Sequence, residues 1–363
     1  MGNFQSKKKS NSTKSNIKFL KQINKLENDL KHIKSLKFSN IDNNIKKKLN
    51  CKISNIIFEG NGINSIAYCG ALDRLNELGY LKNVNGYCGS NIGSICACLL
   101  SIGYTTSELI TIIKNTNFND FIDNEIGYIH DYYNLLNNYG YCSGNHLYNW
   151  IGTLIQEKVG NSDYTFNNLW NNHKKYLIIT GTNLSNLSTQ YYSYKNYPNM
   201  LIRDAIRISM TIPFMFTPIE WDNNVLVDGG ISNKYPLDIF DTTDSNGKIN
   251  LNWNSIGIKL NYVNSNDSNN LEHGKCTVDG LQSFNYSLVN NMYNNKYYSN
   301  TESSWLRSIT INIKEIEPIQ FNINRLQKEY LINQGIIGVD NFFKIRNEIK
   351  NIDFQKNEKK SKK

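Results

Sequence analysis

The stretch of sequence that decides the fold is 84-VNGYCGSNIGSICACLLSI-102. Residues 84–88 predict a short buried strand, and residues 94–102 predict an apolar helix. A strand, a sharp turn and a helix, with glycines two places on either side of the apex, form the pattern of a nucleophile elbow. The glycines leave room for the chain to fold back on itself. The turn reads Gly89-Ser90-Asn91-Ile92-Gly93, so an asparagine occupies the apex where this pattern needs a serine.

Two more glycine turns follow predicted strands. The apolar run 53–58 leads into 59-EGNGINS-65, after which a helix is expected over residues 66–78. This geometry aims backbone N–H groups at an anion, and alone it fits a nucleotide phosphate or a plain tight turn equally well. Further along, the strand 225–227 delivers Asp228 into a Gly229-Gly230 turn. Such an aspartate serves as the base for a nearby hydroxyl, or it caps the turn.

In this order, the three turns resemble those of the patatin-like phospholipase family. The resemblance covers about residues 51 to 350 and extends beyond the turns themselves. It is carried by the stretches FEGNGINSIAYCGALDRLNELGY, NGYCGSNIGSICACLLSIGY, KYLIITGTNL, IRDAIRISMTIPFMFTPIEWDNNVLVDGGISNKYPL and SITINIKEIEPIQFNINRLQKEYLINQG. It implies an α/β fold with three layers, in which a central, mostly parallel sheet is flanked by helices.

The resemblance also implies a chemistry. Such enzymes use a serine–aspartate dyad without a histidine, a metal or a cofactor. Asp228 matches the dyad base, and Asn91 falls on the position of the missing serine nucleophile. Gly89 and Gly93 match the elbow glycines, and Gly229 and Gly230 match the turn after the aspartate. The matching oxyanion loop is Gly60, Asn61, Gly62 and Ile63, where Asn61 replaces a glycine, and the nearby Asn64 and Ser65 replace a basic residue and a second glycine.

The asparagine at the apex decides what activity to expect. Acyl transfer needs a hydroxyl that loses its proton as it attacks, and a carboxamide has no such proton. We therefore expect impaired hydrolysis, with the Asn91 side chain available to donate a hydrogen bond to Asp228. Two alternatives supply a substitute nucleophile: the neighbouring hydroxyls of Ser90 and Ser94, and, less well placed on the strand, Cys88.

Charge divides the chain into three parts. The net charge is +9, but residues 1–50 alone carry +10 and residues 355–363 carry +4, which leaves −5 for residues 51–354. We interpret residues 1–50 as a basic arm, 51–350 as the patatin-like domain and 351–363 as a basic tail. Basic arms attract anionic membranes or nucleic acid, or they only keep a protein soluble. We expect a lipid or membrane surface as the partner and no nucleic acid; the oligomeric state is left open.

The N-terminal arm carries a possible lipid anchor. Gly2 and Ser6 fit the N-myristoylation signal, and Lys7-Lys8-Lys9 follow at once. One myristoyl chain binds a membrane only marginally, and a polybasic patch is a common second signal. Apolar residues with heptad spacing predict an amphipathic helix that packs on the domain, pairs with another helix or lies on a membrane: Phe19, Ile23, Leu26, Leu30 and Ile33.

The remaining features place the protein inside the cell. Seven cysteines, an odd number, show no metal-type spacing, and the N-terminus lacks a secretory signal. The longest apolar run, residues 92–104, is too short to span a bilayer. The sequence thus favours an intracellular protein, on the cytoplasmic face of a membrane if Gly2 is myristoylated. Three functions compete: an impaired lipid-binding domain, an active lipid acyl hydrolase with a substitute nucleophile, and a structural scaffold at a membrane.

Overall fold

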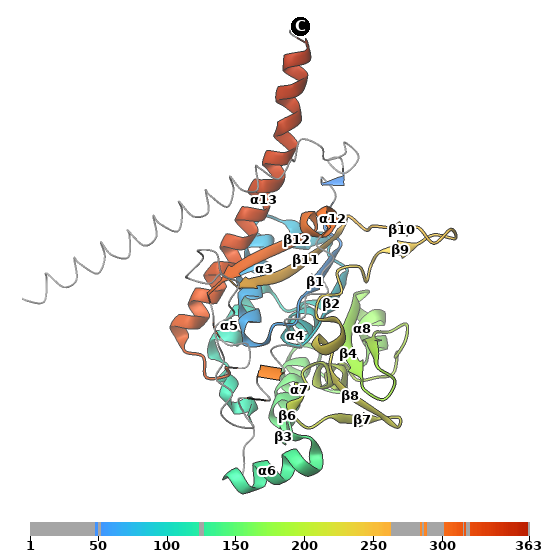
Figure 1. The fold of residues 1–363 in the computed structure, drawn as a ribbon, viewed down its shortest axis with the longest axis vertical. Helices are drawn as coiled ribbons and strands as arrows, with labels where there is room; N and C mark the ends of the chain where they lie inside the picture. Colours follow the sequence, from blue (N-terminus) through green and yellow to red (C-terminus); the bar gives the residue numbers. More distant parts are fainter. Residues whose placement is uncertain are drawn as a thin grey trace, which may run out of the picture. The chain divides into compact units, whose positions relative to one another are not determined.

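The computed structural model describes residues 48–49, 52–122, 127–262, 284, 287–288, 301–314, 316 and 320–361 (Figure 1). The chain divides into two units, one of residues 51–344 and one that combines residues 1–50 with 345–363. The predicted myristoylation site at Gly2 and the predicted helix over residues 19–33 lie outside the described residues. The larger unit holds the elbow and both of the other glycine turns.

The larger unit is built on an eight-stranded sheet in which parallel pairs dominate. Its order is β12-β11-β1-β2-β4-β8-β7, and β5 pairs with β4. The five strands from β12 to β4 run parallel, whereas β8, β7 and β5 are antiparallel to their neighbours. The bounds are β1 Asn55–Phe58, β2 Gly86–Gly89, β4 Tyr176–Asn183, β5 Ser188–Tyr192, β7 Ile219–Trp221, β8 Asn224–Asp228, β11 Ser255–Tyr262 and β12 Ser308–Ile313.

The rest of the described chain forms helices and two further pairs of short strands. The helices are η2 Gly62–Ile66, α3 Ala67–Glu77, η3 Tyr80–Asn83, α4 Ile92–Ser101, α5 Thr106–Asn115, η4 Phe118–Phe121, α6 Gly127–Asn138, α7 Asn145–Val159, α8 Phe166–His173, α9 Ile202–Ser209, α10 Gly230–Asn233, α12 Glu302–Leu306 and α13 Arg325–Ser361. Two further strand pairs are β3 Gly140–Cys142 with β6 Phe214–Phe216, and β9 Thr242–Thr243 with β10 Ile249–Asn250. The helix expected over residues 66–78 is preceded by the 3-10 turn η2, and the one expected from residue 94 begins at Ile92.

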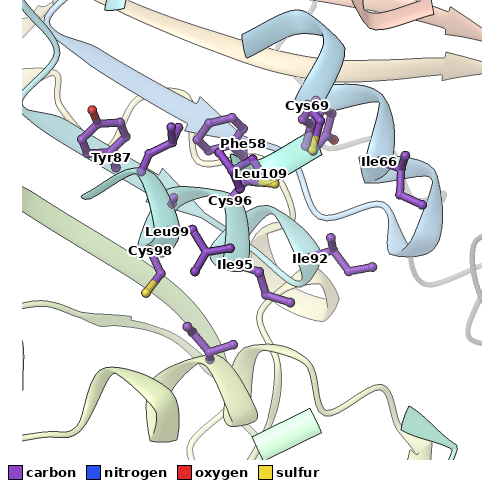
Figure 2. Close-up of a cluster of buried hydrophobic side chains, with 14 of the residues drawn as sticks. Phe58, Ile66, Cys69, Tyr87, Ile92, Ile95, Cys96, Cys98, Leu99 and Leu109 are labelled. Atoms are coloured by element: carbon purple, nitrogen blue, oxygen red, sulfur yellow. The ribbon is translucent and has the colours of Figure 1, made fainter. Parts of the chain in front are cut away.

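The main core lies on one face of the sheet. Alternate strand residues such as Ile56 and Phe58 of β1 point into it, as the period of two in a strand requires. Helix α4 is buried along its whole length, which explains why its sequence is apolar on every side. Figure 2 shows Ile92, Ile95 and Leu99 of α4 within this cluster, near Phe58.

A smaller hydrophobic cluster lies on the other face of the sheet. Ile57, Cys88 and Ile178 point to this side and pack against Tyr235 and Leu237, which follow α10. The predicted α/β fold, a mostly parallel sheet flanked by helices, is confirmed. On this second face, the cover described for the cluster around Ile57 comes from the residues after α10. None of the described helices combines the length and the apolar character that a membrane span requires.

Candidate active site

The apex of the elbow is Asn91, between β2 and α4. Its backbone has φ 51° and ψ −132°, a conformation that few residues other than glycine adopt. Asparagine tolerates positive φ better than most residues with a side chain. Asn91 is fully buried, as is Asp228. The turn geometry expected of a nucleophile elbow is therefore present, and an amide stands at its apex.

The glycines of the elbow are required by close packing. A Cβ atom added to Gly89 would lie 2.2 Å from the carbonyl oxygen of Gly93. One added to Gly93 would lie 2.8 Å from the carbonyl oxygen of Glu59, and one added to Gly229 would lie 2.2 Å from Oγ1 of Thr180. These distances are far below van der Waals contact. The glycine pattern that predicted the turn thus reflects the close approach of neighbouring backbones.

Asn91 and Asp228 are joined directly. The Nδ2 group of Asn91 donates a hydrogen bond to Oδ2 of Asp228, as the sequence led us to expect. The other carboxylate oxygen, Oδ1, accepts from the backbone N–H of Gly230 at 2.6 Å. A buried carboxylate is costly unless it is hydrogen-bonded, and these two donors stabilise it. The asparagine thereby occupies the face of Asp228 that a serine hydroxyl would need.

Helix α9 and the residues after it hold both members of this pair. The backbone N–H of Asn91 donates to Oγ of Ser209 at 3.0 Å, and the backbone N–H of Asp228 donates to the carbonyl of Thr211 at 2.9 Å. Oγ1 of Thr182 donates to the carbonyl of Asp228 at 2.7 Å. Sequence reasoning did not assign Ser209, Thr211 or Thr182, although all three lie within or beside the stretches that carry the resemblance. Nothing local in the sequence marks them, because each contact joins residues far apart in the chain.

The predicted oxyanion loop runs beside the elbow. A Cβ atom added to Gly60 would lie 3.0 Å from both Cβ of Asn91 and Oγ of Ser90, so the loop and the elbow touch here. Gly62 has φ 53° and starts the turn η2, which also contains Ile63. The backbone N–H of Gly60, however, donates to the carbonyl of Lys234 at 2.8 Å. That N–H group is therefore engaged within the protein.

A buried network fixes the side chains of this loop. Nδ2 of Asn61 donates to Oε2 of Glu59 at 2.9 Å, and the hydroxyl of Tyr262 donates to Oδ1 of Asn61 at 3.0 Å. Asn64 donates to the same Tyr262 hydroxyl at 3.1 Å. Oε1 of Glu59 also lies 3.5 Å from the ammonium group of Lys234. Asn61 and Asn64, both noted as departures from the family pattern, are thus structural parts of one network around the Glu59 carboxylate.

The three candidate substitute nucleophiles are poorly placed. The Ser94 hydroxyl donates to the carbonyl of Asn91 at 2.6 Å. The Ser90 oxygen is buried and has no hydrogen-bond partner in the described part of the chain, so it does not reach the aspartate there. Burial raises the pKa of the Cys88 thiol, which favours the unreactive protonated form, and its side chain packs with Ile57 and Ile178. The side chain at the apex, Asn91, donates to Asp228.

Comparisons with known proteins agree on the family. The model of the patatin-like phospholipase family matches residues 56–241, just over half of the chain. An uncharacterised protein of Acanthamoeba polyphaga mimivirus is 31% identical over 304 residues, which cover 82% of this chain and 97% of that protein. A protein of Invertebrate iridescent virus 6 named as a probable lipid hydrolase is 28% identical over 185 residues, covering 51% of this chain and 62% of that protein.

A solved structure supports the same fold. VipD of Legionella pneumophila superimposes with a TM-score of 0.53 at 15% sequence identity, covering 82% of this chain and 67% of VipD. At this identity the likeness concerns the fold alone. The family model, which matches just over half of the chain, confirms the family predicted from the three glycine turns. The chain belongs to the patatin-like phospholipase family.

Proposed function

We propose that this protein is a catalytically impaired member of its family that binds lipid at a membrane surface. The single observation that carries the proposal is the amide of Asn91, which stands at the apex of the elbow and donates to Asp228. In an active dyad, the aspartate takes a proton from the hydroxyl that attacks the ester. Here the carboxylate already accepts a hydrogen bond from a group that cannot attack.

The size of the impairment follows from the chemistry. Removal of a nucleophile from a hydrolase that acts through one lowers kcat by roughly six orders of magnitude. The oxyanion loop adds to this loss, because the Gly60 N–H is engaged with the Lys234 carbonyl. Each missing oxyanion donor costs roughly 10²–10³ in kcat. The missing nucleophile and the engaged loop N–H both lower kcat.

Lipid is the ligand class that the relatives favour. A related viral protein carries the name of a probable lipid hydrolase, and a protein that loses the reaction can keep the binding. The basic arm of residues 1–50, with net charge +10, supports attachment to an anionic membrane. Myristoylation of Gly2 would supply the second signal that such an arm needs.

The proposal is tested by two readouts on the full chain. A fluorophosphonate probe reacts covalently with activated serines, and intact-mass measurement should find no adduct on this protein. Flotation with vesicles of phosphatidylcholine and phosphatidylserine should recover the myristoylated protein with the lipid. An adduct on Ser90 or Ser94 would instead establish a working hydrolase with a substitute nucleophile. Failure to float would leave a structural role without lipid binding.

A further inference from the structure

An amine and a carboxamide contact the same buried carboxylate beside the oxyanion loop. Oε1 of Glu59 lies 3.5 Å from the ammonium group of Lys234, and Oε2 accepts from Nδ2 of Asn61 at 2.9 Å. A carboxylate placed between two nitrogen atoms can take a proton from one and deliver it to the other. We propose that Lys234 and Asn61 become joined by an isopeptide bond, which the folded chain forms by itself with release of ammonia.

The backbone holds Lys234 against the loop. Its carbonyl accepts from the N–H of Gly60, the residue between Glu59 and Asn61, at 2.8 Å. The side chain of Lys234 is 13% exposed and that of Glu59 is 1% exposed, and Asn61 is also buried. Groups that a fold holds in one place react far faster than the same groups free in solution. The backbone and the side chain of Lys234 thus both contact the segment that carries Asn61.

The carbonyl of the Asn61 side chain has a donor of its own. The hydroxyl of Tyr262 donates to Oδ1 of Asn61 at 3.0 Å, and Nδ2 of Asn64 donates to that hydroxyl at 3.1 Å. Because the Tyr262 oxygen accepts from Asn64, its proton is directed toward Asn61. A donor in this position stabilises the negative charge that develops on the carbonyl oxygen when an amine attacks the carbon.

Glu59 supplies the path for the protons. The backbone N–H of Leu260 also donates to its Oε2, at 2.8 Å, which fixes the carboxylate in place. Glu59 takes a proton from the ammonium group, and the neutral Nζ of Lys234 attacks Cγ of Asn61. The Nζ–Cγ bond forms and the Cγ–Nδ2 bond breaks. In all, Nζ loses two protons and Nδ2 gains two through Glu59, so the leaving group departs as an ammonium ion and Glu59 ends as a carboxylate. The balance is complete without a co-reactant.

The bond would tie the oxyanion loop to the segment after Asp228. Asn61 belongs to the loop, and Lys234 follows α10, which begins at Gly230. The N–H of Gly60, which already donates to the Lys234 carbonyl, would then be held in that contact by a covalent link. This inference goes beyond the proposed function, because the reaction depends neither on Asn91 nor on a lipid.

Intact-mass measurement and tryptic mapping of the full chain test the proposal. After prolonged incubation of the folded protein, we expect a mass one ammonia below that of the sequence and a branched peptide that contains both Asn61 and Lys234. Lys234→Arg keeps the positive charge without the amine, and Glu59→Gln keeps the size of the side chain without the carboxylate, so neither should form the branched peptide. Lys82→Ala, at an exposed lysine elsewhere, is the matched control and should form it as the unchanged protein does. Thermal denaturation verifies that each variant is folded.

The branched peptide also separates the isopeptide from a side reaction of Asn61. Asn61 precedes Gly62, and the N–H of that glycine can displace ammonia to form a succinimide of the same mass. A succinimide forms without Lys234 and in the urea-unfolded chain, whereas the isopeptide needs both the lysine and the fold. Separate peptides for Asn61 and Lys234 in the unchanged protein would overturn the proposal. A branched peptide that forms equally in Glu59→Gln would also overturn it, because the carboxylate would then have no part in the reaction.

Discussion

At the scale of single residues, Asn91 satisfies two structural requirements of the elbow. The apex needs a residue that accepts φ 51°, and the buried Asp228 carboxylate needs a donor. Asparagine meets both demands, since it tolerates positive φ and its Nδ2 group donates to the carboxylate. The turn survives without its nucleophile because the side chain that replaces serine satisfies the same aspartate.

Restoring the hydroxyl tests this interpretation. In Asn91→Ser, the new side chain stands at the apex beside Asp228, so we expect measurable but weak release of p-nitrophenol from a short-chain ester. The gain stays small because Lys234 still engages the Gly60 N–H. Asn91→Ala is the control, since it removes the amide without adding a hydroxyl. Equal rates for the serine and alanine variants would show that the loop alone prevents hydrolysis.

A change of the amide to a carboxyl group tests the hydrogen bond itself. Asn91→Asp replaces the donor to Asp228 with a second buried carboxyl, and such a pair has one strongly raised pKa. A folded-state pKa above the unfolded value of about 4 means that stability is retained below that pH and lost as pH rises. Urea unfolding should show a deficit of about 3–5 kcal/mol at neutral pH that shrinks toward pH ~4. Asn91→Ala should show a weaker pH dependence of the same sign, because Asp228 loses one donor but gains no neighbouring carboxyl; an equal slope in both variants would contradict the pairing.

At the scale of elements, the elbow is a contact between β1, β2 and the start of α4. Gly89 and Gly93 lie where two backbones approach too closely for any side chain. This local requirement is what made the elbow predictable from sequence. The Glu59 network was not predictable, because Tyr262 and Asn61 are 201 positions apart and neither carries a pattern. The 3-10 turn η2 was also not predicted, because a glycine-rich turn and a short 3-10 helix have similar amino-acid compositions.

A glycine substitution tests the close packing. In Gly89→Ala, the added Cβ would lie 2.2 Å from the Gly93 carbonyl, so the strand and the helix must separate. We expect a loss of about 1–3 kcal/mol or more in the free energy of unfolding. Gly152→Ala is the matched control, because its nearest contact would be the flexible end of Arg203 at 3.2 Å and no backbone atom is among its closest neighbours. A Gly89→Ala variant as stable as the control would contradict the packing described here.

At the scale of the whole chain, the basic segments and the predicted domain occupy different parts of the sequence. Residues 51–354, which include the predicted domain of residues 51–350, are mildly acidic, at −5, and both ends of the chain are basic. The family and the sheet were predictable because three glycine turns, each following a strand, occur in a fixed order. The contact between Lys234 and Glu59 was not, because only the fold brings these distant residues together.

The lipid anchor is tested on intact protein. Cells that express the chain with an alkyne analogue of myristate should incorporate the label, and Gly2→Ala should abolish incorporation. Vesicle binding should then fall in Gly2→Ala and should fall further when salt screens the basic arm. Lys52→Ala is the control for a single lost charge outside the arm. Labelling that persists in Gly2→Ala would place the lipid elsewhere.

Acyl release from phospholipid by the purified full chain tests the central claim most directly. The claim is that the amide of Asn91 leaves Asp228 without a hydroxyl to activate. It predicts that fatty-acid release from phosphatidylcholine vesicles is no faster for the unchanged protein than for Asp228→Ala. Clear turnover that disappears in Asp228→Ala would contradict it.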